Sequence, residues 1–117
     1  MLLIPTMRKV TNEELLIEIA ESKLRDMPTC KLGELCVSIA TRQLYKPGFI
    51  SSSSYELQQD MLMEGIKQML ISYKAFDPTK DDNAFAYFVI MTHRGFRRVL
   101  NKKKMEQIIK DINAQVE

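Results

Sequence analysis

Three prolines divide this sequence of 117 residues into segments of helical length, at Pro28, Pro47 and Pro78. Proline disfavours helical geometry in the residue before it, so a helix is expected to end ahead of each one. The chain holds only four glycines and four prolines, too few for the many turns of a β-sandwich or barrel. Eight methionines and no tryptophan are typical of an adaptable helical core. We therefore expect an all-α fold, a compact bundle of about four helices in a single domain.

Capping residues and apolar periodicity place the first three helices. Thr11 and Glu14 form the pattern of a capping box, which predicts that the first helix begins at Thr11; it is expected to end just before Pro28. Apolar residues at helical spacing predict a second helix over about 31–44. A loop with a run of serines is expected at 47–54, and the third helix over about 55–75 begins at one of these serine caps.

The fourth helix is expected to be the longest. Asn83 is a good N-cap, and the helical pattern continues through Leu100 and on to the C-terminus. These observations predict a flexible N-terminal segment at 1–10, a helical domain at 11–104 and a helical extension at 105–117.

Charge is distributed unevenly along the chain. The net charge is +2, but the segment 91–110 carries seven basic residues against Glu106 alone, a charge of +6. The remainder therefore carries −4. A basic end on a slightly acidic body is typical of a protein that binds a polyanion at one end and a protein partner at the other.

Other sequence signals exclude several classes of protein. No stretch approaches the roughly 20 apolar residues of a membrane span, and the first ten residues lack the pattern of a signal peptide. Cys30, Cys36 and the single His93 do not have the spacing of a metal site. We expect reduced cysteines, no metal or other cofactor, no membrane association and a cytoplasmic location.

An acidic stripe lies on the third helix. Glu56, Asp60 and Glu64 are spaced by four, opposite the apolar face, and Met63 and Leu70 lie beside them. Apolar residues that flank a carboxylate row can form a docking surface. A solvated acidic face with an incidental methionine explains the same pattern, and both interpretations stay open here.

The fourth helix has two different faces. One is expected to enter the core and carries Phe85, Val89, Thr92, Phe96, Val99 and Leu100, with Phe88 at its edge. The other carries Tyr87, Ile90, Met91, Arg94 and Arg98 and leads to the run Lys102, Lys103 and Lys104. Cationic groups beside an aromatic ring suit phosphates and an unstacked base. Basic amphipathic helices also bind membranes or proteins, and Tyr87 alternatively lies at the core's edge with its hydroxyl in water.

Three stretches together resemble region 2 of bacterial sigma factors, the initiation subunits of RNA polymerase. Leu35-Cys36-Val37-Ser38-Ile39-Ala40 resembles the first helix of that region. Asp60-Met61-Leu62-Met63-Glu64-Gly65 with the later Phe76-Asp77-Pro78 resembles the polymerase-binding helix. Ala84-Phe85-Ala86-Tyr87-Phe88 with Arg97-Arg98 resembles the helix that melts the promoter −10 element. The acidic loop and the segment 83–88 are most similar to the late sigma factors of tailed bacteriophages, so the resemblance implies a fold like sigma domain 2.

The resemblance also implies two binding surfaces. The polymerase-binding residues would be Asp60, Met63, Glu64 and Leu70, docked on the basic coiled coil of the polymerase β′ subunit. Tyr87 would stack on the flipped adenine of a −10-like element, with Ile90 and Met91 in place of the family's tryptophan wedge. The remaining DNA-binding residues would follow the duplex and its phosphates: Arg94, Arg97, Arg98, Lys102, Lys103 and Lys104.

Three residues near these surfaces are expected to be structural. Gly65 permits close packing of two helices, and Phe76 fills the core. Asp77 braces the loop that follows it.

The resemblance implies a non-catalytic specificity subunit in the cytoplasm of a bacterial host. No nucleophile–base pair, metal cluster or glycine-rich phosphate loop is present, so we expect no enzymatic activity. Two alternatives stay open, an inhibitor or appropriator that occupies the sigma site on the polymerase, and a small helical module that binds single-stranded nucleic acid. No segment resembles the −35-reading region 4 or a clamp-binding tail, and the sequence identifies neither the promoter nor a co-activator.

Overall fold

The computed structural model describes residues 9–50 and 54–116, without the side chains of residues 50 and 116. The expected flexible segment 1–10 therefore lies almost wholly outside the described residues. Helices make up 83% of the described residues, and no strand occurs among them. The elements are α2 (Asn12–Arg25), α3 (Cys30–Leu44), α4 (Pro47–Ile50), α5 (Tyr55–Ser72), the 3-10 turn η1 (Tyr73–Ala75) and α6 (Ala84–Val116). The prediction of an all-α bundle is confirmed.

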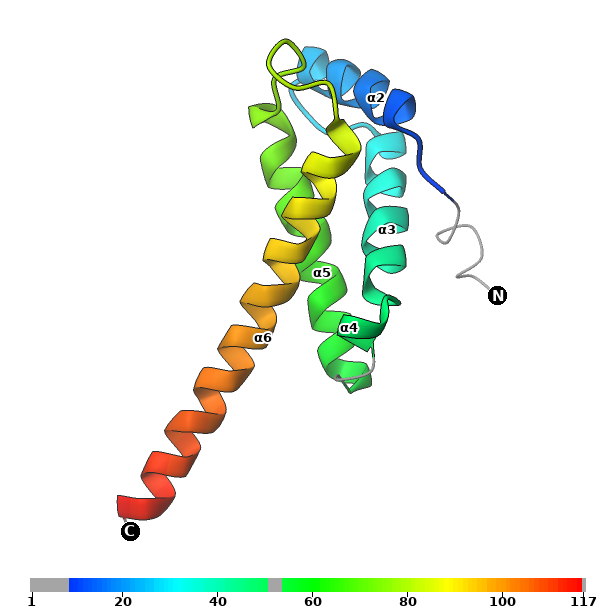
Figure 1. Cartoon of the computed structure of the whole chain (residues 1–117). Helices are drawn as coiled ribbons and strands as arrows, with labels where there is room; N and C mark the ends of the chain where they lie inside the picture. Colours follow the sequence, from blue (N-terminus) through cyan, green and yellow to red (C-terminus); the bar gives the residue numbers. More distant parts are fainter. Residues whose placement is uncertain (1–8, 51–53, 117) are drawn as a thin grey trace.

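The bundle is built around the pair α5 and α6, which have the most extensive contact in the molecule. Helix α3 packs against both, and α2 crosses the end of the bundle where α6 begins (Figure 1). Helix α5 runs antiparallel to α3 and α6 (Figure 1). The 33-residue α6 is much longer than its neighbours, so its C-terminal part projects beyond them.

The predicted caps form hydrogen bonds at the helix starts. The Thr11 amide donates to Glu14 Oε2 at 2.9 Å, and the Glu14 amide donates to Thr11 Oγ1 at 3.2 Å, which completes the capping box. Ser54 Oγ accepts from the Leu57 amide at 3.2 Å, and Asn83 Oδ1 accepts from the Ala86 amide at 2.9 Å. These bonds satisfy amides that have no partner within the helix.

Two clusters of buried apolar residues form the core. The larger cluster joins α2, α3, α5 and α6, and the smaller contains Leu44, Met61 and Phe96. Phe76 belongs to the larger cluster and is only 2% exposed, which confirms that it fills the core. Full burial of a large apolar side chain contributes about 1.5–3 kcal/mol.

Helices α5 and α6 cross at two glycines. A Cβ added to Gly95 would lie 2.7 Å from the Gly65 Cα and amide nitrogen, and one added to Gly65 would lie 2.9 Å from Phe96 Cε1. Close packing at Gly65 was predicted and is confirmed. The matching role of Gly95 was not predicted, because nothing in its local sequence shows which backbone approaches it.

Two local features differ from the predictions. The segment expected to be a loop contains the single helical turn α4, held by the ring of Phe49, whose centroid lies 4.9 Å from that of Phe96 and 5.2 Å from that of His93. Phe85, expected to face the core, is 36% exposed. Both differences arise from tertiary packing, which local propensity does not include.

Candidate polymerase and nucleic-acid interface

The four predicted polymerase-binding residues line a single groove between α5 and α6. The groove has a volume of about 870 Å³, and Asp60, Met63, Glu64 and Leu70 all contribute to its wall on α5. Met63 is 69% exposed, whereas Leu70 is half-buried and packs against the larger core cluster. The structure thus combines carboxylates and apolar side chains on one accessible surface.

The opposite wall of this groove is basic. It contains Arg98 and Lys102 of α6, and Arg98 Nε lies 3.8 Å from Glu64 Oε2. Gln68 Nε2 donates to the same oxygen at 2.9 Å. A smaller hollow next to the groove brings Asp60 and Lys103 to one surface.

This arrangement corrects the expectation of two separate surfaces. Arg98, Lys102 and Lys103 were assigned to DNA, and the structure places them beside the acidic stripe. Because α6 crosses α5 at their glycines, the basic run of α6 descends along the same side as the carboxylates of α5.

Tyr87 lies at the edge of the core. Its ring centroid is 5.1 Å from that of Phe76 and 6.0 Å from that of Phe88. Its hydroxyl donates to the Ser72 carbonyl oxygen at 2.9 Å, and burial raises the pKa of this hydroxyl. The ring is therefore held in a fixed orientation, half-buried, with its hydroxyl bonded to protein.

Met91 does not lie on the exposed face assigned to DNA. It is 6% exposed and belongs to the larger core cluster. The helical periodicity predicts a single buried face for α6. Because α6 packs against α2, α3 and α5, a wider arc of its surface is buried. The expected apolar wedge is thereby reduced to Ile90, which is 51% exposed.

The other predicted DNA-binding residues are accessible. Arg94, Arg97, Arg98, Lys102, Lys103 and Lys104 are all exposed along α6. Asp77 has the structural role predicted for it, since its Oδ1 accepts from the Thr79 amide at 2.9 Å and from Thr79 Oγ1 at 2.7 Å. These two hydrogen bonds lower the pKa of the Asp77 carboxyl.

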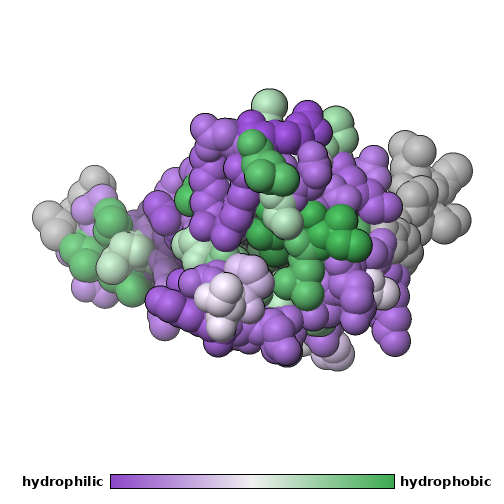
Figure 2. Space-filling view, turned by 90° about the horizontal axis from the view of Figure 1, so that it is seen from above, coloured by the Kyte–Doolittle hydropathy of each residue, from purple (hydrophilic) through white to green (hydrophobic). Residues whose placement is uncertain are grey.

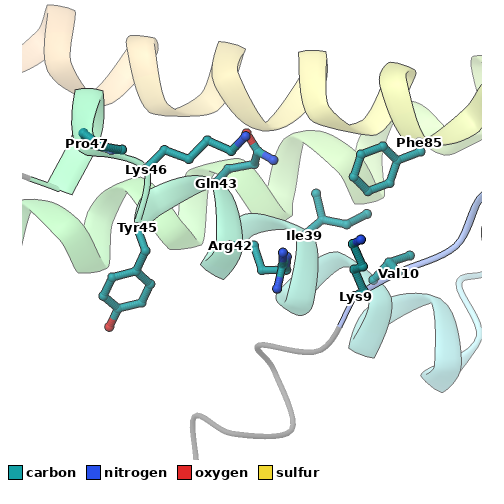
Figure 3. A pocket seen from close by; sticks show the side chains of 9 residues that line it. All are labelled: Lys9, Val10, Ile39, Arg42, Gln43, Tyr45, Lys46, Pro47 and Phe85. Atoms are coloured by element: carbon teal, nitrogen blue, oxygen red, sulfur yellow. The ribbon is translucent and has the colours of Figure 1, made fainter.

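Sequence reasoning missed a second groove, on the α3 side of α6 (Figure 3). Its volume is about 550 Å³, and its described lining contains basic residues and no acidic one. The residues that line it are Lys9, Val10, Ile39, Arg42, Gln43, Tyr45, Lys46, Pro47 and Phe85. They come from distant parts of the chain, so no spacing in the sequence could have indicated the groove.

An apolar hollow also lies at the end of the bundle where α2 crosses, on the face seen in Figure 2. Its lining includes Leu16, Leu24, Phe76 and Pro78, and Leu24 is 84% exposed. Sequence reasoning did not predict this patch either, because it forms only where α2 meets the segment after η1.

No protein-family model matches this sequence, and no curated protein matches it significantly. Within residues 9–50 and 54–116, no helix combines the length and apolar character required to cross a membrane. The same residues contain no group of three or more His, Cys, Asp or Glu side chains placed to hold a metal ion.

Proposed function

We propose that this protein is a sigma-like, non-catalytic initiation subunit. It would bind the β′ coiled coil of a bacterial core RNA polymerase and recognise and melt a −10-like late promoter element. The motifs that resemble sigma region 2 support this proposal. The structural observation that carries it is the groove on α5, in which Asp60, Met63, Glu64 and Leu70 lie together.

The carboxylates on the α5 wall of the groove suit a basic helical partner, which would have to move Lys67, Arg98 and Lys102 of the same lining aside. Carboxylates of opposite charge would steer a basic coiled coil and fix its register, and Met63 would supply apolar contact. The Arg98 side chain is 72% exposed, and its Nε lies 3.8 Å from Glu64 Oε2, a long distance for an ion pair. This pair is therefore weak. A partner's cation at Glu64 would displace Arg98 and release it toward nucleic acid.

The basic surface of α6 suits promoter DNA. Its exposed arginines and lysines would neutralise phosphates. An unstacked base would pack on the accessible part of the Tyr87 ring, which the hydrogen bond to Ser72 holds in place. Stacking on an aromatic side chain contributes about 1–3 kcal/mol per base.

The first test is transcription in vitro with purified bacterial core polymerase on late-promoter templates of phages. Start-site-specific transcripts are expected only when this protein is present. The double variant Asp60→Lys with Glu64→Lys should bind core polymerase about 10- to 100-fold more weakly. The matched control, Glu21→Lys with Glu34→Lys, changes the net charge equally at exposed sites on α2 and α3 and should bind normally. If the Asp60→Lys, Glu64→Lys variant binds core polymerase as tightly as the control variant, the docking surface is disproved.

Promoter opening tests Tyr87. Tyr87→Ala should destabilise the open complex by about 1–3 kcal/mol, and Tyr87→Phe should be mild because the ring is retained. Permanganate reactivity of thymines in the −10-like element measures opening. A pre-melted bubble should rescue Tyr87→Ala, and wild-type opening of duplex promoters by this variant would refute base capture.

A second candidate function is a polymerase-binding inhibitor or appropriator that occupies the sigma site without melting DNA. The burial of Met91 favours it, because one of the two wedge positions is enclosed in the core. The same assay separates the two functions. An inhibitor would block transcription by the host sigma factor and produce no start-site-specific transcripts of its own.

A further inference from the structure

The projecting part of α6 carries an apolar stripe. Met105, Ile108, Ile109 and Ile112 are 57%, 43%, 51% and 53% exposed, and their spacing places them on one face of the helix. This part of α6 extends beyond the other helices (orange to red in Figure 1). Three isoleucines within five residues are poor helix formers without packing, so a partner that covers this face would stabilise the helix.

The stripe does not face α5. The α6 residues next to the start of α5 are Lys102, Lys103 and Glu106, which line the hollow there. With 3.6 residues per turn, the stripe is displaced by about a third of a turn from these residues. It continues the row of α6 that carries Ile90, Arg94 and Arg98, but it lies beyond the approach of Arg98 to Glu64 of α5, and all four of its side chains are exposed. The intramolecular partner α5 therefore leaves this face uncovered.

Charges beside the stripe indicate the kind of partner. Lys104 and Asp111 are seven residues apart, so they lie two turns apart on the same flank. Both are exposed, and Gln107 Nε2 donates to Asp111 Oδ1 at 3.1 Å, which orients the carboxylate. An anionic partner on this flank, whether DNA or an acidic membrane, would pair with Lys104 but would leave Asp111 without a cation. A second copy of the chain would satisfy both charges.

We propose that the apolar stripe binds a second copy of this chain in antiparallel orientation. Two-fold symmetry then brings the same flank of each helix together, and the register that matches the stripes places Ile108 against Ile109 of the second copy. In this register Lys104 of each copy lies within reach of Asp111 of the other. Antiparallel pairing also carries the two bundles to opposite ends of the paired segment.

Parallel pairing is disfavoured by charge. It would continue along the same face of α6 and bring Arg94 and Arg98 of one copy toward the same residues of the other. Like charges placed opposite each other are destabilising. The antiparallel interface would be short, with four apolar residues from each copy, so it should bury less than the roughly 1,200 Å² typical of stable complexes. The dimer should therefore form in the micromolar range or at higher concentration.

Sedimentation velocity of the full chain over a concentration series tests this proposal. The wild-type protein should shift from monomer to dimer as its concentration rises, and Ile108→Asp should remain monomeric. Lys104→Glu and Asp111→Lys should each weaken dimerisation by about tenfold. The double variant, with both charges exchanged, should recover wild-type affinity.

The control variant is Lys110→Glu, which makes the same charge change as Lys104→Glu on a side of α6 turned away from the stripe and should dimerise normally. Circular dichroism establishes that each variant retains its helices. A wild-type chain that stays monomeric throughout overturns the proposal. Failure of the double variant to recover overturns the antiparallel register. Because the assay contains no polymerase, its result is independent of the proposed function in transcription.

Discussion

Replacing Gly95 with alanine should force α5 and α6 apart and destabilise the protein. The new Cβ would lie 2.7 Å from the Glu64 carbonyl oxygen, the Gly65 amide nitrogen and the Gly65 Cα, whereas carbon atoms normally pack at about 3.5–4.0 Å. All three neighbours are backbone atoms, so no change of rotamer relieves the clash. Overpacking costs about 1–3 kcal/mol or more, and alanine returns about 1 kcal/mol of helix propensity. Because backbone atoms cannot move aside, we take the cost at the upper end of this range, about 3 kcal/mol, and expect a net loss of about 2 kcal/mol.

Two other glycines provide matched comparisons. Gly65→Ala would place its Cβ 2.9 Å from Phe96 Cε1 and 3.3 Å from Thr92 Cγ2, which are side-chain atoms that can shift, so its cost should be smaller. Gly33→Ala meets nothing within 4 Å and should stabilise the protein by up to about 1 kcal/mol through helix propensity alone.

Urea unfolding followed by far-ultraviolet circular dichroism measures this series. The midpoint should be highest for Gly33→Ala, followed by the wild type, Gly65→Ala and Gly95→Ala. A loss of about 2 kcal/mol lowers the midpoint by roughly 1–2 M urea at the usual dependence on denaturant. The reasoning is refuted if Gly95→Ala is as stable as the wild type or more stable than Gly65→Ala.

Single residues elsewhere in the chain give predictions for reactivity, pH dependence and salt dependence. Thiol reagents at about pH 8 should modify exposed Cys30 and spare Cys36, because burial raises the pKa of Cys36 to about 12; a count of two fast thiols in the folded protein would contradict this. Burial, with Arg97 and Lys46 nearby, lowers the pKa of His93 below 6.5. The unfolded chain therefore binds the proton first as pH falls, so the free energy of unfolding should decrease below about pH 6.5. Urea titrations at several pH values measure this decrease, and His93→Gln should remove the contribution of His93 to it. Replacing Lys102, Lys103 and Lys104 with alanine should reduce the slope of log DNA affinity against log salt concentration by up to about three, measured for the complex with polymerase. An unchanged slope would place these lysines away from DNA.

Local sequence signals determined where most helices begin. The side chains of Thr11, Ser54 and Asn83 each accept a hydrogen bond from an amide of the first turn, an interaction that involves only residues three apart in sequence. The start of α3 was placed one residue late, because Thr29 caps it through a bond to the Leu32 amide at 3.0 Å and was not recognised as a cap. The acidic stripe with its flanking apolar residues was also predictable, since helical periodicity alone places those residues on one side of α5.

Only the tertiary structure decided how the faces of α6 are used. Its first half contacts three other helices, so Met91 enters the core and Phe85 remains partly exposed. The glycine crossing determines that Arg98 lies beside Glu64, which joins two surfaces that periodicity had kept apart. A sequence pattern specifies the direction of a side chain around its own helix axis. It does not specify which neighbours surround that axis, and these neighbours decide which side chains are buried and which charges meet.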